Sequence, residues 1–304
     1  TAKNLKAFEP TVAALAKEFV DRMEDHGGSC DFAADIAYWF PLRVILTLMG
    51  VPQEDEAEVL RMTQRLLSPA DKSLKARTAE QGTDGQAKVR GGDVVADFAA
   101  YFHDLAAHRR QHPTRDTIAN GQVGGCPMAR HEMTSYFVIV STAGHDTTAA
   151  SISGGLQALI ETPDELTKLR GDLSLLQTAA EEFVRITAPV KHFMRTPNRD
   201  VEWHGRTIPA GDAVMLCYAS ACRDETVFAD ADLLRVDRPL NPGHLAFGFG
   251  PHFCLGRALA TMEIRSFYRE LLGRLKGIEL AGTPSFIQSV FVSGHKSLPV
   301  AYRF

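Results

Sequence analysis

The sequence FGFGPHFCLG spans residues 247–256 and places one cysteine, Cys254, just before an apolar segment that predicts a helix. Unpaired N–H groups and the positive end of the dipole at a helix start favour a thiolate over a thiol, and a thiolate can bind iron. The glycines of this segment let a tight loop approach a flat ligand. Phe247 and Phe249 could shield the sulfur from water. The alternative is a buried, inert cysteine at the start of a helix.

The chain before this segment has the apolar periodicity of helices. Apolar residues recur at steps of three and four from Phe8 to Met23, and the pattern stops at Gly27-Gly28. Polar residues and glycines predict a mobile surface loop over residues 68–92 and a second loop over 121–127. Further helices are expected over residues 32–50, from Pro52 onward, over 94–110, over 131–161, from Pro163, over 175–184 and over 254–275.

Short strand-like runs appear only in the last third of the chain. They lie at Val201–Trp203, Thr207–Ile208 and Ala213–Tyr218, with turn residues between them. The tail from Ser285 to Phe304 predicts a hairpin. The expected fold class is therefore mainly α, with a small β-sheet region.

Composition excludes several classes of protein. The chain has 304 residues, 45% apolar and 23% charged, which is enough for a large core. With 33 basic against 37 acidic residues the net charge is −4, so no nucleic-acid partner is expected. No apolar run approaches the roughly 18 residues of a membrane span and no signal peptide is visible, so a cytoplasmic protein without a membrane partner is expected. Five cysteines without a C-x-x-C pair indicate reduced thiols.

A second group of polar residues, AGHDTT at 143–148, lies inside the expected helix 131–161. The Thr147 hydroxyl can bond the carbonyl four residues back, and Gly144 lets the helix open to admit a ligand. Asp146 beside that alcohol can relay protons. The alternative is a threonine-rich turn with a solvated Asp146, although an unpaired carboxylate in so apolar a helix would be costly. His145 is expected to be a packing residue.

Glu182 and Arg185 are three residues apart, so their side chains can meet on one helical face. Such a pair is commonly a surface ion pair of small value.

The FGFGPHFCLG segment resembles the haem-ligand loop of the cytochrome P-450 monooxygenases, with the pattern F-x-x-G-x-x-x-C-x-G. AGHDTT resembles the oxygen-activation motif of this family, and Glu182-x-x-Arg185 resembles its E-x-x-R core. The resemblance extends over essentially the whole chain and implies a single cytochrome P-450 domain at 1–304. Because family members are usually about a hundred residues longer, the N-terminal helices and strands of that fold are expected to be missing.

The resemblance also implies roles for individual residues. Cys254 would be the metal ligand of haem b, and Asp146 and Thr147 would deliver protons to bound dioxygen. Glu182 and Arg185 would lock to Arg238 as structural support. The residues expected to contact the cofactor are Arg195 and His252, at the haem propionates, with Phe247, Gly248, Gly256, Ala143 and Gly144. A solvated arginine is the alternative for Arg195.

The implied reaction inserts one oxygen atom of O2 into an apolar small molecule. The run from Ala188 to Thr196 is similar to bacterial members that hydroxylate terpene alcohols, so a terpenoid is expected. Pocket residues would be Val140, Val190, Val290 and Phe291, each of which could equally be plain core. Gly248-x-Gly250 fails the dinucleotide pattern, so electrons are expected from a ferredoxin and its NAD(P)H-dependent ferredoxin reductase.

Three alternatives stay open. Arg257, Arg265 and Arg269 share one helical face, which is either solvated or a docking surface for an acidic ferredoxin. The chain could be a truncated haem-binding remnant without turnover. An enzyme that uses peroxide or performs dehydration is disfavoured, because the Asp146-Thr147 pair is intact.

Overall fold

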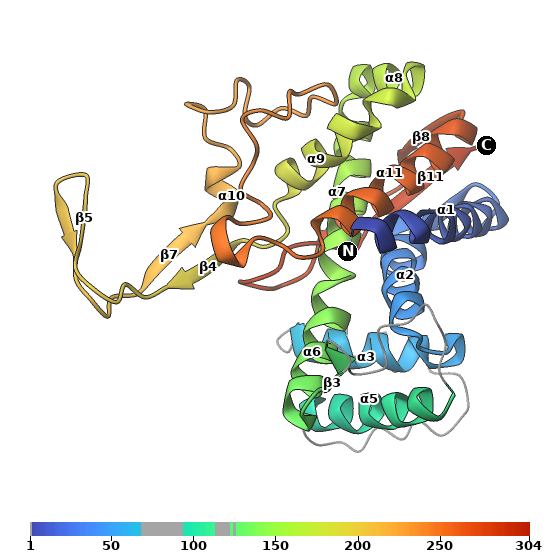
Figure 1. Ribbon diagram of the computed structural model, residues 1–304. Helices are drawn as coiled ribbons and strands as arrows, with labels where there is room; N and C mark the ends of the chain where they lie inside the picture. Colours follow the sequence, from blue (N-terminus) through green and yellow to red (C-terminus); the bar gives the residue numbers. More distant parts are fainter. Residues whose placement is uncertain (1, 68–93, 113–121, 124–125) are drawn as a thin grey trace.

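Helices make up most of the molecule (Figure 1). The structure is a computed structural model and describes residues 2–67, 94–112, 122–123 and 126–304. The α-helices are α1 (Ala2–Asp25), α2 (Trp39–Met49), α3 (Glu56–Leu67), α5 (Val94–Gln111), α6 (Arg130–Ala143), α7 (Asp146–Glu161), α8 (Pro163–Gly171), α9 (Leu176–Thr187), α10 (Tyr218–Ala221) and α11 (Arg257–Arg274). Shorter helical turns are η1 (Phe32–Ala37), η2 (Gln53–Asp55), η4 (Leu173–Leu175) and η5 (Gly250–His252).

The strands are short and pair antiparallel. They are β1 (Ser29–Asp31), β2 (Gln122–Val123), β3 (Cys126–Pro127), β4 (His192–Arg195), β5 (Val201–Trp203), β6 (Arg206–Ile208), β7 (Val214–Cys217), β8 (Gly277–Leu280), β9 (Ser285–Phe286), β10 (His295–Ser297) and β11 (Pro299–Arg303). Strands β1, β11 and β8 form one sheet in that order, and the other described strands form two-stranded pairs. The mainly α fold with small sheets is confirmed.

Aromatic side chains join the long helices into one core. Phe40 of α2 lies between Phe19 of α1 and Phe267 of α11, at ring-centroid distances of 5.9 and 5.4 Å. The buried Tyr268 hydroxyl donates to the Ile152 carbonyl of α7 at 2.6 Å. Each buried aromatic side chain of this kind stabilises the fold by about 1.5–3 kcal/mol. Helix α11, which directly follows the Cys254 segment, is therefore fixed against three other helices.

The ends of α1 and α2 follow the glycine signals of the sequence. Helix α1 ends just before Gly27, whose φ is +73°, and α2 ends at Gly50, whose φ is +76°. Glycine accepts these left-handed angles without strain. The second predicted stretch, 32–50, is a π-helical turn followed by α2. The predicted loop over 68–92 lies outside the described residues.

The single helix predicted over 131–161 is wrong. Helix α6 ends at Ala143 and α7 begins at Asp146. Gly144 keeps right-handed helical angles, and the backbone departs from them at His145, whose φ is −121°. A Cβ atom on Gly144 would lie 2.6 Å from the Val140 carbonyl and 2.8 Å from Ile45. Since no larger residue fits there, the break is built around that glycine. The apolar pattern continues through the break, which is why periodicity did not mark it.

The tail is also more complex than the predicted hairpin. Strands β9 and β10 do form a hairpin, but β11 pairs with β8 and with β1 near the start of the chain, where Ser29 lies opposite Ala301. A three-residue strand carries too short a period to be recognised in a sequence. The helix predicted from Cys254 begins three residues later, at Arg257.

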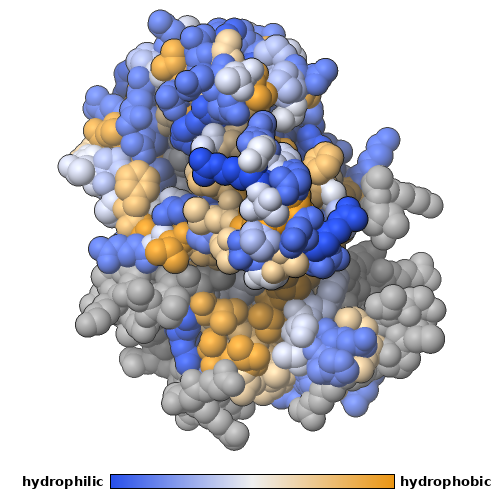
Figure 2. Space-filling view, turned by 90° about the vertical axis from the view of Figure 1, so that its left-hand side faces the viewer, coloured by the Kyte–Doolittle hydropathy of each residue, from blue (hydrophilic) through white to orange (hydrophobic). Residues whose placement is uncertain are grey.

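One stretch, Phe32–Met49, is long and apolar enough to cross a membrane by composition, contrary to the expectation that none approaches this length. Of this stretch 72% is buried inside the protein, as in a core helix. Hydrophobic side chains also gather on the face that Figure 2 presents, below a hollow that crosses the middle of the molecule.

Candidate active site

The loop before α11 is tightly hydrogen-bonded. The Cys254 amide donates to the Phe247 carbonyl at 2.9 Å, and the Phe253 amide donates to the Gly250 carbonyl at 3.0 Å. Gly248 and Gly250 have φ values of +73° and +70°, which L side chains rarely adopt. A Cβ on Gly248 would also lie 3.3 Å from the Tyr218 hydroxyl. The loop therefore presents one partly buried sulfur from a fixed backbone.

Two effects oppose one another at the Cys254 sulfur. Burial raises the pKa of the thiol, while hydrogen bonds from the Gly256 and Arg257 amides lower it, and burial dominates. The expectation that the helix start alone favours a thiolate is thus corrected for the protein by itself. The two amides still provide donors that would stabilise a thiolate bound to a cation.

The two phenylalanines expected to shield the sulfur behave differently. Phe247 is half-buried and packs against Arg257, whose guanidinium lies 5.7 Å from the ring centroid. Phe249 is 84% exposed, so its predicted shielding is wrong for this chain. Phe253 is 46% exposed, and the same guanidinium lies 5.7 Å from its ring centroid.

The AGHDTT residues lie at the break between α6 and α7. The Thr147 hydroxyl donates to the Ala143 carbonyl at 3.1 Å, which confirms the predicted hydrogen bond. Asp146 is mostly buried, and its Oδ1 lies 3.0 Å from Nε2 of His145. His145 is fully buried, as expected of a packing residue, and its ring also contacts the Ser141 carbonyl and the Asp146 carboxylate.

Arg195 and His252 were expected to meet the carboxylates of a haem. The Arg195 guanidinium donates to the Met194 carbonyl at 2.8 Å and lies 5.9 Å from the ring of Phe193. His252 is exposed on η5. Neither has a carboxylate partner among the described residues. Phe193 packs on Tyr218, whose hydroxyl is near Gly248, so β4 is tied to the cysteine loop. A free thiol, an arginine without a carboxylate partner and an exposed imidazole that can donate a hydrogen bond fit a haem with two propionates.

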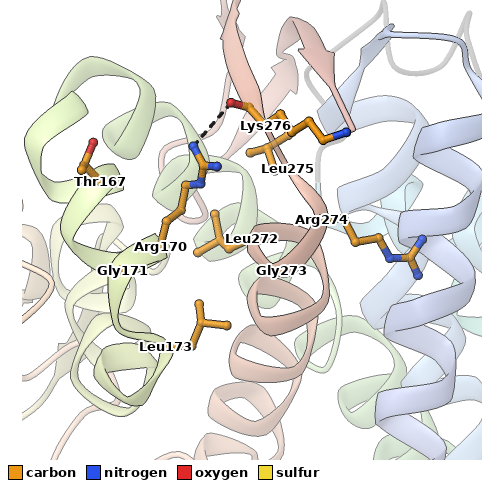
Figure 3. Close-up of a pocket in the computed structure, with 9 residues that line it drawn as sticks. All are labelled: Thr167, Arg170, Gly171, Leu173, Leu272, Gly273, Arg274, Leu275 and Lys276. Carbon is orange, nitrogen blue, oxygen red and sulfur yellow. Dashed lines mark hydrogen bonds between the residues drawn. The ribbon is translucent and has the colours of Figure 1, made fainter.

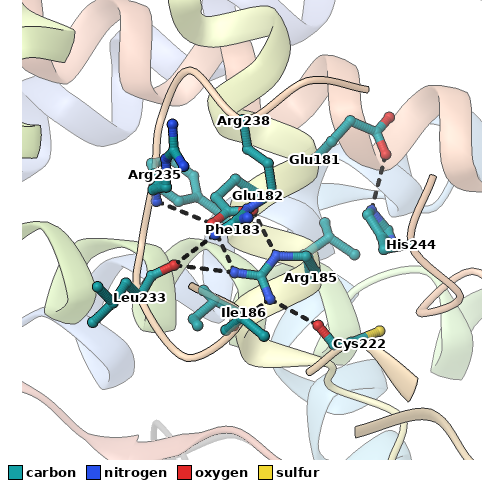
Figure 4. Close-up of polar contacts among 12 residues, drawn as sticks. Glu181, Glu182, Phe183, Arg185, Ile186, Cys222, Leu233, Arg235, Arg238 and His244 are labelled. Atoms are coloured by element: carbon teal, nitrogen blue, oxygen red, sulfur yellow. Dashed lines mark hydrogen bonds and ion pairs between the residues drawn. The ribbon is translucent and has the colours of Figure 1, made fainter. Parts of the chain in front are cut away.

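Glu182, Arg185 and Arg238 are brought together in a buried network (Figure 4). Arg185 forms two bonds to Glu182, at 2.7 and 2.8 Å, and Arg238 donates to the same carboxylate at 2.9 Å. Arg185 also donates to the Cys222 carbonyl at 2.7 Å. The Cys222 sulfur in turn accepts the amides of Leu245 and Ala246. The network therefore reaches the segment that leads into the cysteine loop.

Sequence reasoning missed a second bridge to this loop. Glu181 accepts from His244 Nε2 at 3.1 Å and from Arg257 at 3.0 Å (Figure 4 shows the first contact). Burial works against it, but the His244 hydrogen bond and the Arg257 charge lower the pKa of Glu181. His244 precedes the loop and Arg257 follows it, so one carboxylate holds both ends. The only sequence signal was an acidic residue beside Glu182.

The residues expected to line a substrate pocket are partly assembled. Val190 pairs with Val292 in an isolated β-bridge, and Phe291 lies 5.3 Å from the ring of Phe193. Val140 is half-buried on α6. Val290 is 83% exposed. Three of the four residues therefore contribute to apolar surface near β4 or α6, and Val290 points to solvent.

An open surface hollow lies elsewhere, between α8, the end of α11 and β8 (Figure 3). It is lined by Arg170, Leu173, Leu272 and Lys276, among others, and the Arg170 guanidinium donates to the Lys276 carbonyl at 3.5 Å. None of the predicted site residues lines it. Within the described ranges there is also no group of three or more His, Cys, Asp or Glu side chains arranged to hold a metal ion.

Comparison with known proteins gives a consistent family. A family model described as Cytochrome P450 matches residues 119–283. Cytochrome P450-terp of Pseudomonas sp is 37% identical over 302 residues, covering 98% of this chain and 70% of that protein. Steroid C26-monooxygenase of Mycobacterium tuberculosis is 34% identical over 308 residues, covering 99% and 80%.

Solved structures agree. The crystal structure of CYP108D1 from Novosphingobium aromaticivorans has a TM-score of 0.85 at 40% identity and covers 100% of this chain and 70% of that one. CYP268A2 of Mycobacterium marinum, in complex with pseudoionone, has a TM-score of 0.86 at 32% identity and covers 99% and 72%.

Proposed function

This chain belongs to the cytochrome P450 family, and from that premise we propose that it hydroxylates a small apolar molecule, a terpenoid, with electrons from a ferredoxin. Its enzyme class is that of the P450 monooxygenases, and its cofactor is haem b. The observation that carries the proposal is the loop in which Cys254 follows two left-handed glycines and its sulfur accepts hydrogen bonds from the Gly256 and Arg257 amides.

In this proposal the Cys254 sulfur holds the iron in its ionised form. The amides of Gly256 and Arg257 stabilise its charge, and the Arg257 guanidinium keeps Phe247 and Phe253 in place beside the loop. Arg195 and His252 bind the two haem carboxylates. When bound, the haem supplies the chemistry that activates dioxygen.

At the break between α6 and α7, Asp146 and Thr147 would supply the protons that the reaction needs. The Thr147 hydroxyl already donates to the Ala143 carbonyl, so its hydrogen is oriented and its lone pairs stay available to receive a proton. Asp146, the next residue toward the N-terminus, has a mostly buried carboxylate 3.0 Å from Nε2 of His145. Gly144 leaves the space that a Cβ would fill.

The substrate is apolar because the side chains offered to it are apolar. Val140, Val190 and Phe291 contribute such surface, and water exclusion there protects the reactive site. The similarity to a terpene P450 and to a P450 bound to pseudoionone favours a terpenoid over other apolar molecules. A steroid is the competing class, from the similarity to steroid C26-monooxygenases.

The electron donor is a small acidic ferredoxin with its reductase. Arg269 is exposed on α11, where it can meet an acidic partner. Arg265 donates to Gln177 and Arg257 binds Glu181, so the docking face offers less free charge than three arginines suggest. A location in the bacterial cytoplasm is part of the same proposal, because the relatives are bacterial.

The test is turnover of the full chain with a ferredoxin, its reductase, NAD(P)H and a panel of terpene alcohols and steroids. We expect one hydroxylated terpenoid that carries a single atom from isotopically labelled dioxygen. Haem binding without product from any member would identify a remnant and contradict the proposal. Preferred turnover of a steroid would contradict the terpenoid assignment alone.

A further inference from the structure

His145 sits in the break between α6 and α7 with a fully buried imidazole. Its Nδ1 lies 2.8 Å from the Ser141 carbonyl, and its Nε2 lies 3.0 Å from Asp146 Oδ1. A carbonyl oxygen and a carboxylate oxygen both accept hydrogen bonds and cannot donate them. While Asp146 is ionised, each ring nitrogen therefore carries a hydrogen, which makes the ring an imidazolium; a protonated Asp146 would instead donate to a neutral ring.

The surroundings of the ring agree with this charge. Helix α3 contributes the Thr63 hydroxyl, 3.4 Å from Nε2, and that hydroxyl donates to the Leu60 carbonyl, so it can only accept from the ring. Helix α2 contributes the apolar Ile45 beside Gly144. In the part of the chain that the structure describes, Asp146 is the one charged group that acts on the ring.

The balance of effects favours the protonated ring. Burial lowers the pKa of His145, but the charge and hydrogen bond of Asp146, together with the Ser141 carbonyl, raise it by more, so the net pKa is above the ordinary value. This direction agrees with the hydrogen-bond geometry, which gives the ring two N–H donors when Asp146 is ionised.

We propose that His145 is the positioning residue of Asp146: a buried imidazolium that fixes the carboxylate at the helix break and holds the proton that converts it to an acid. This inference rests on the proposed function, since it gives Asp146 a source for the proton that it passes toward Thr147. The Nε2–H bond breaks and an Oδ1–H bond forms, so both charges disappear. The ring keeps its Nδ1–H on the Ser141 carbonyl, and solvent replaces the proton through the partly exposed Asp146 carboxyl.

Nuclear magnetic resonance of nitrogen-15 histidine in the full chain tests the charge directly. The ferrous carbon monoxide form is diamagnetic and suits the measurement. We expect both His145 nitrogens to be protonated at about pH 7, with the ring losing this charge in Asp146→Asn. A neutral ring in the native protein, or an unchanged titration in Asp146→Asn, would overturn the inference.

The second readout is the share of electrons that ends in product, measured between about pH 6 and about pH 9. His145→Gln can still donate to Asp146 but cannot carry a proton, so this share should fall about tenfold and lose its pH dependence. His295→Gln is the matched control, because His295 is also buried beside α7 but contacts Ser153 and Gln157 instead of an acid. This control should keep the native pH profile.

The inference would also be overturned if, in His145→Gln, the share of electrons that ends in product depended on pH as it does in the native protein. Failure of the proposed function is distinguishable, because a chain that binds no haem or forms no product still reports the protonation state of His145.

Discussion

Arg185 and Glu182 form a bidentate ion pair with N–O distances of 2.7 and 2.8 Å, and both side chains are only 1% exposed. The remaining donors of Arg185 are taken by the carbonyls of Cys222, Ala231 and Leu233. A buried pair with all its hydrogen bonds made is rigid, and loss of one partner leaves an uncompensated charge.

Glu182→Gln should therefore destabilise the fold by about 3–5 kcal/mol, because two buried guanidinium groups lose their counter-charge. Urea unfolding measures this change. Lys17→Ala is the control, since it removes an exposed ion pair with Asp21 that solvent screens and that contributes little to stability. Equal losses in the two variants would contradict the structural role of the network.

Glu263 shows the opposite situation within the same core. Its carboxyl is fully buried in α11, and neither oxygen has a hydrogen-bond partner among the described residues. Burial raises the pKa of Glu263 well above its ordinary value, so the folded chain holds it neutral. A raised pKa means that its contribution to stability is complete at low pH and is lost as pH rises.

Glu263→Gln should accordingly be more stable than the native chain above about pH 5, with a gain that grows by about 1.4 kcal/mol per pH unit until the native carboxyl ionises. Unfolding curves recorded at several pH values measure the gain. The exposed Glu279 provides the control, and Glu279→Gln should show no such trend. A constant difference across the pH range would refute this account.

Because His295 is buried, we expect the fold to lose stability in acid. Burial lowers its pKa to about 4, against a smaller upward effect of Asp31. The unfolded chain binds the proton more readily, so the stability that this residue contributes is complete above about pH 6.5 and is lost as the pH falls toward 4. The loss should reach about 3 kcal/mol and should be absent in His295→Gln. His26→Gln, at an exposed position, should retain it.

Local relationships were predictable from the sequence. Glu182 and Arg185 are three residues apart on one helix, and Thr147 is four residues from the carbonyl that it bonds, so helical geometry alone brings each pair together. The glycines at the ends of α1 and α2 could be recognised because left-handed angles leave few other residue types.

Relationships over long distances were not predictable. Glu181 and His244 are far apart in the sequence. A single acidic residue and a single distant histidine form no sequence pattern that would predict an ion pair. The exposure of Phe249 depends on how the loop turns at Gly248 and Gly250, which sequence alone does not fix. The burial of His145 was predicted, but its contacts with Ser141 and Asp146 were not, because an apolar pattern around a histidine does not indicate its hydrogen-bond partners.

Thr147→Ala should keep haem binding and divert electrons from product to hydrogen peroxide, lowering the product share about tenfold. The hydroxyl that would receive the proton is then absent. Thr142 is a matched control, because its hydroxyl also bonds a carbonyl four residues back, that of Val138 at 2.7 Å. Peroxide and product yields measure the effect, and equal coupling in the two alanine variants would remove Thr147 from the mechanism.

The most direct test of the central claim is the absorption spectrum of the full chain in its reduced carbon monoxide form. Ligation by the Cys254 thiolate predicts a red-shifted Soret band that disappears in Cys254→Ala. A colourless protein after incubation with haem, or a red-shifted band that survives in Cys254→Ala, would contradict it.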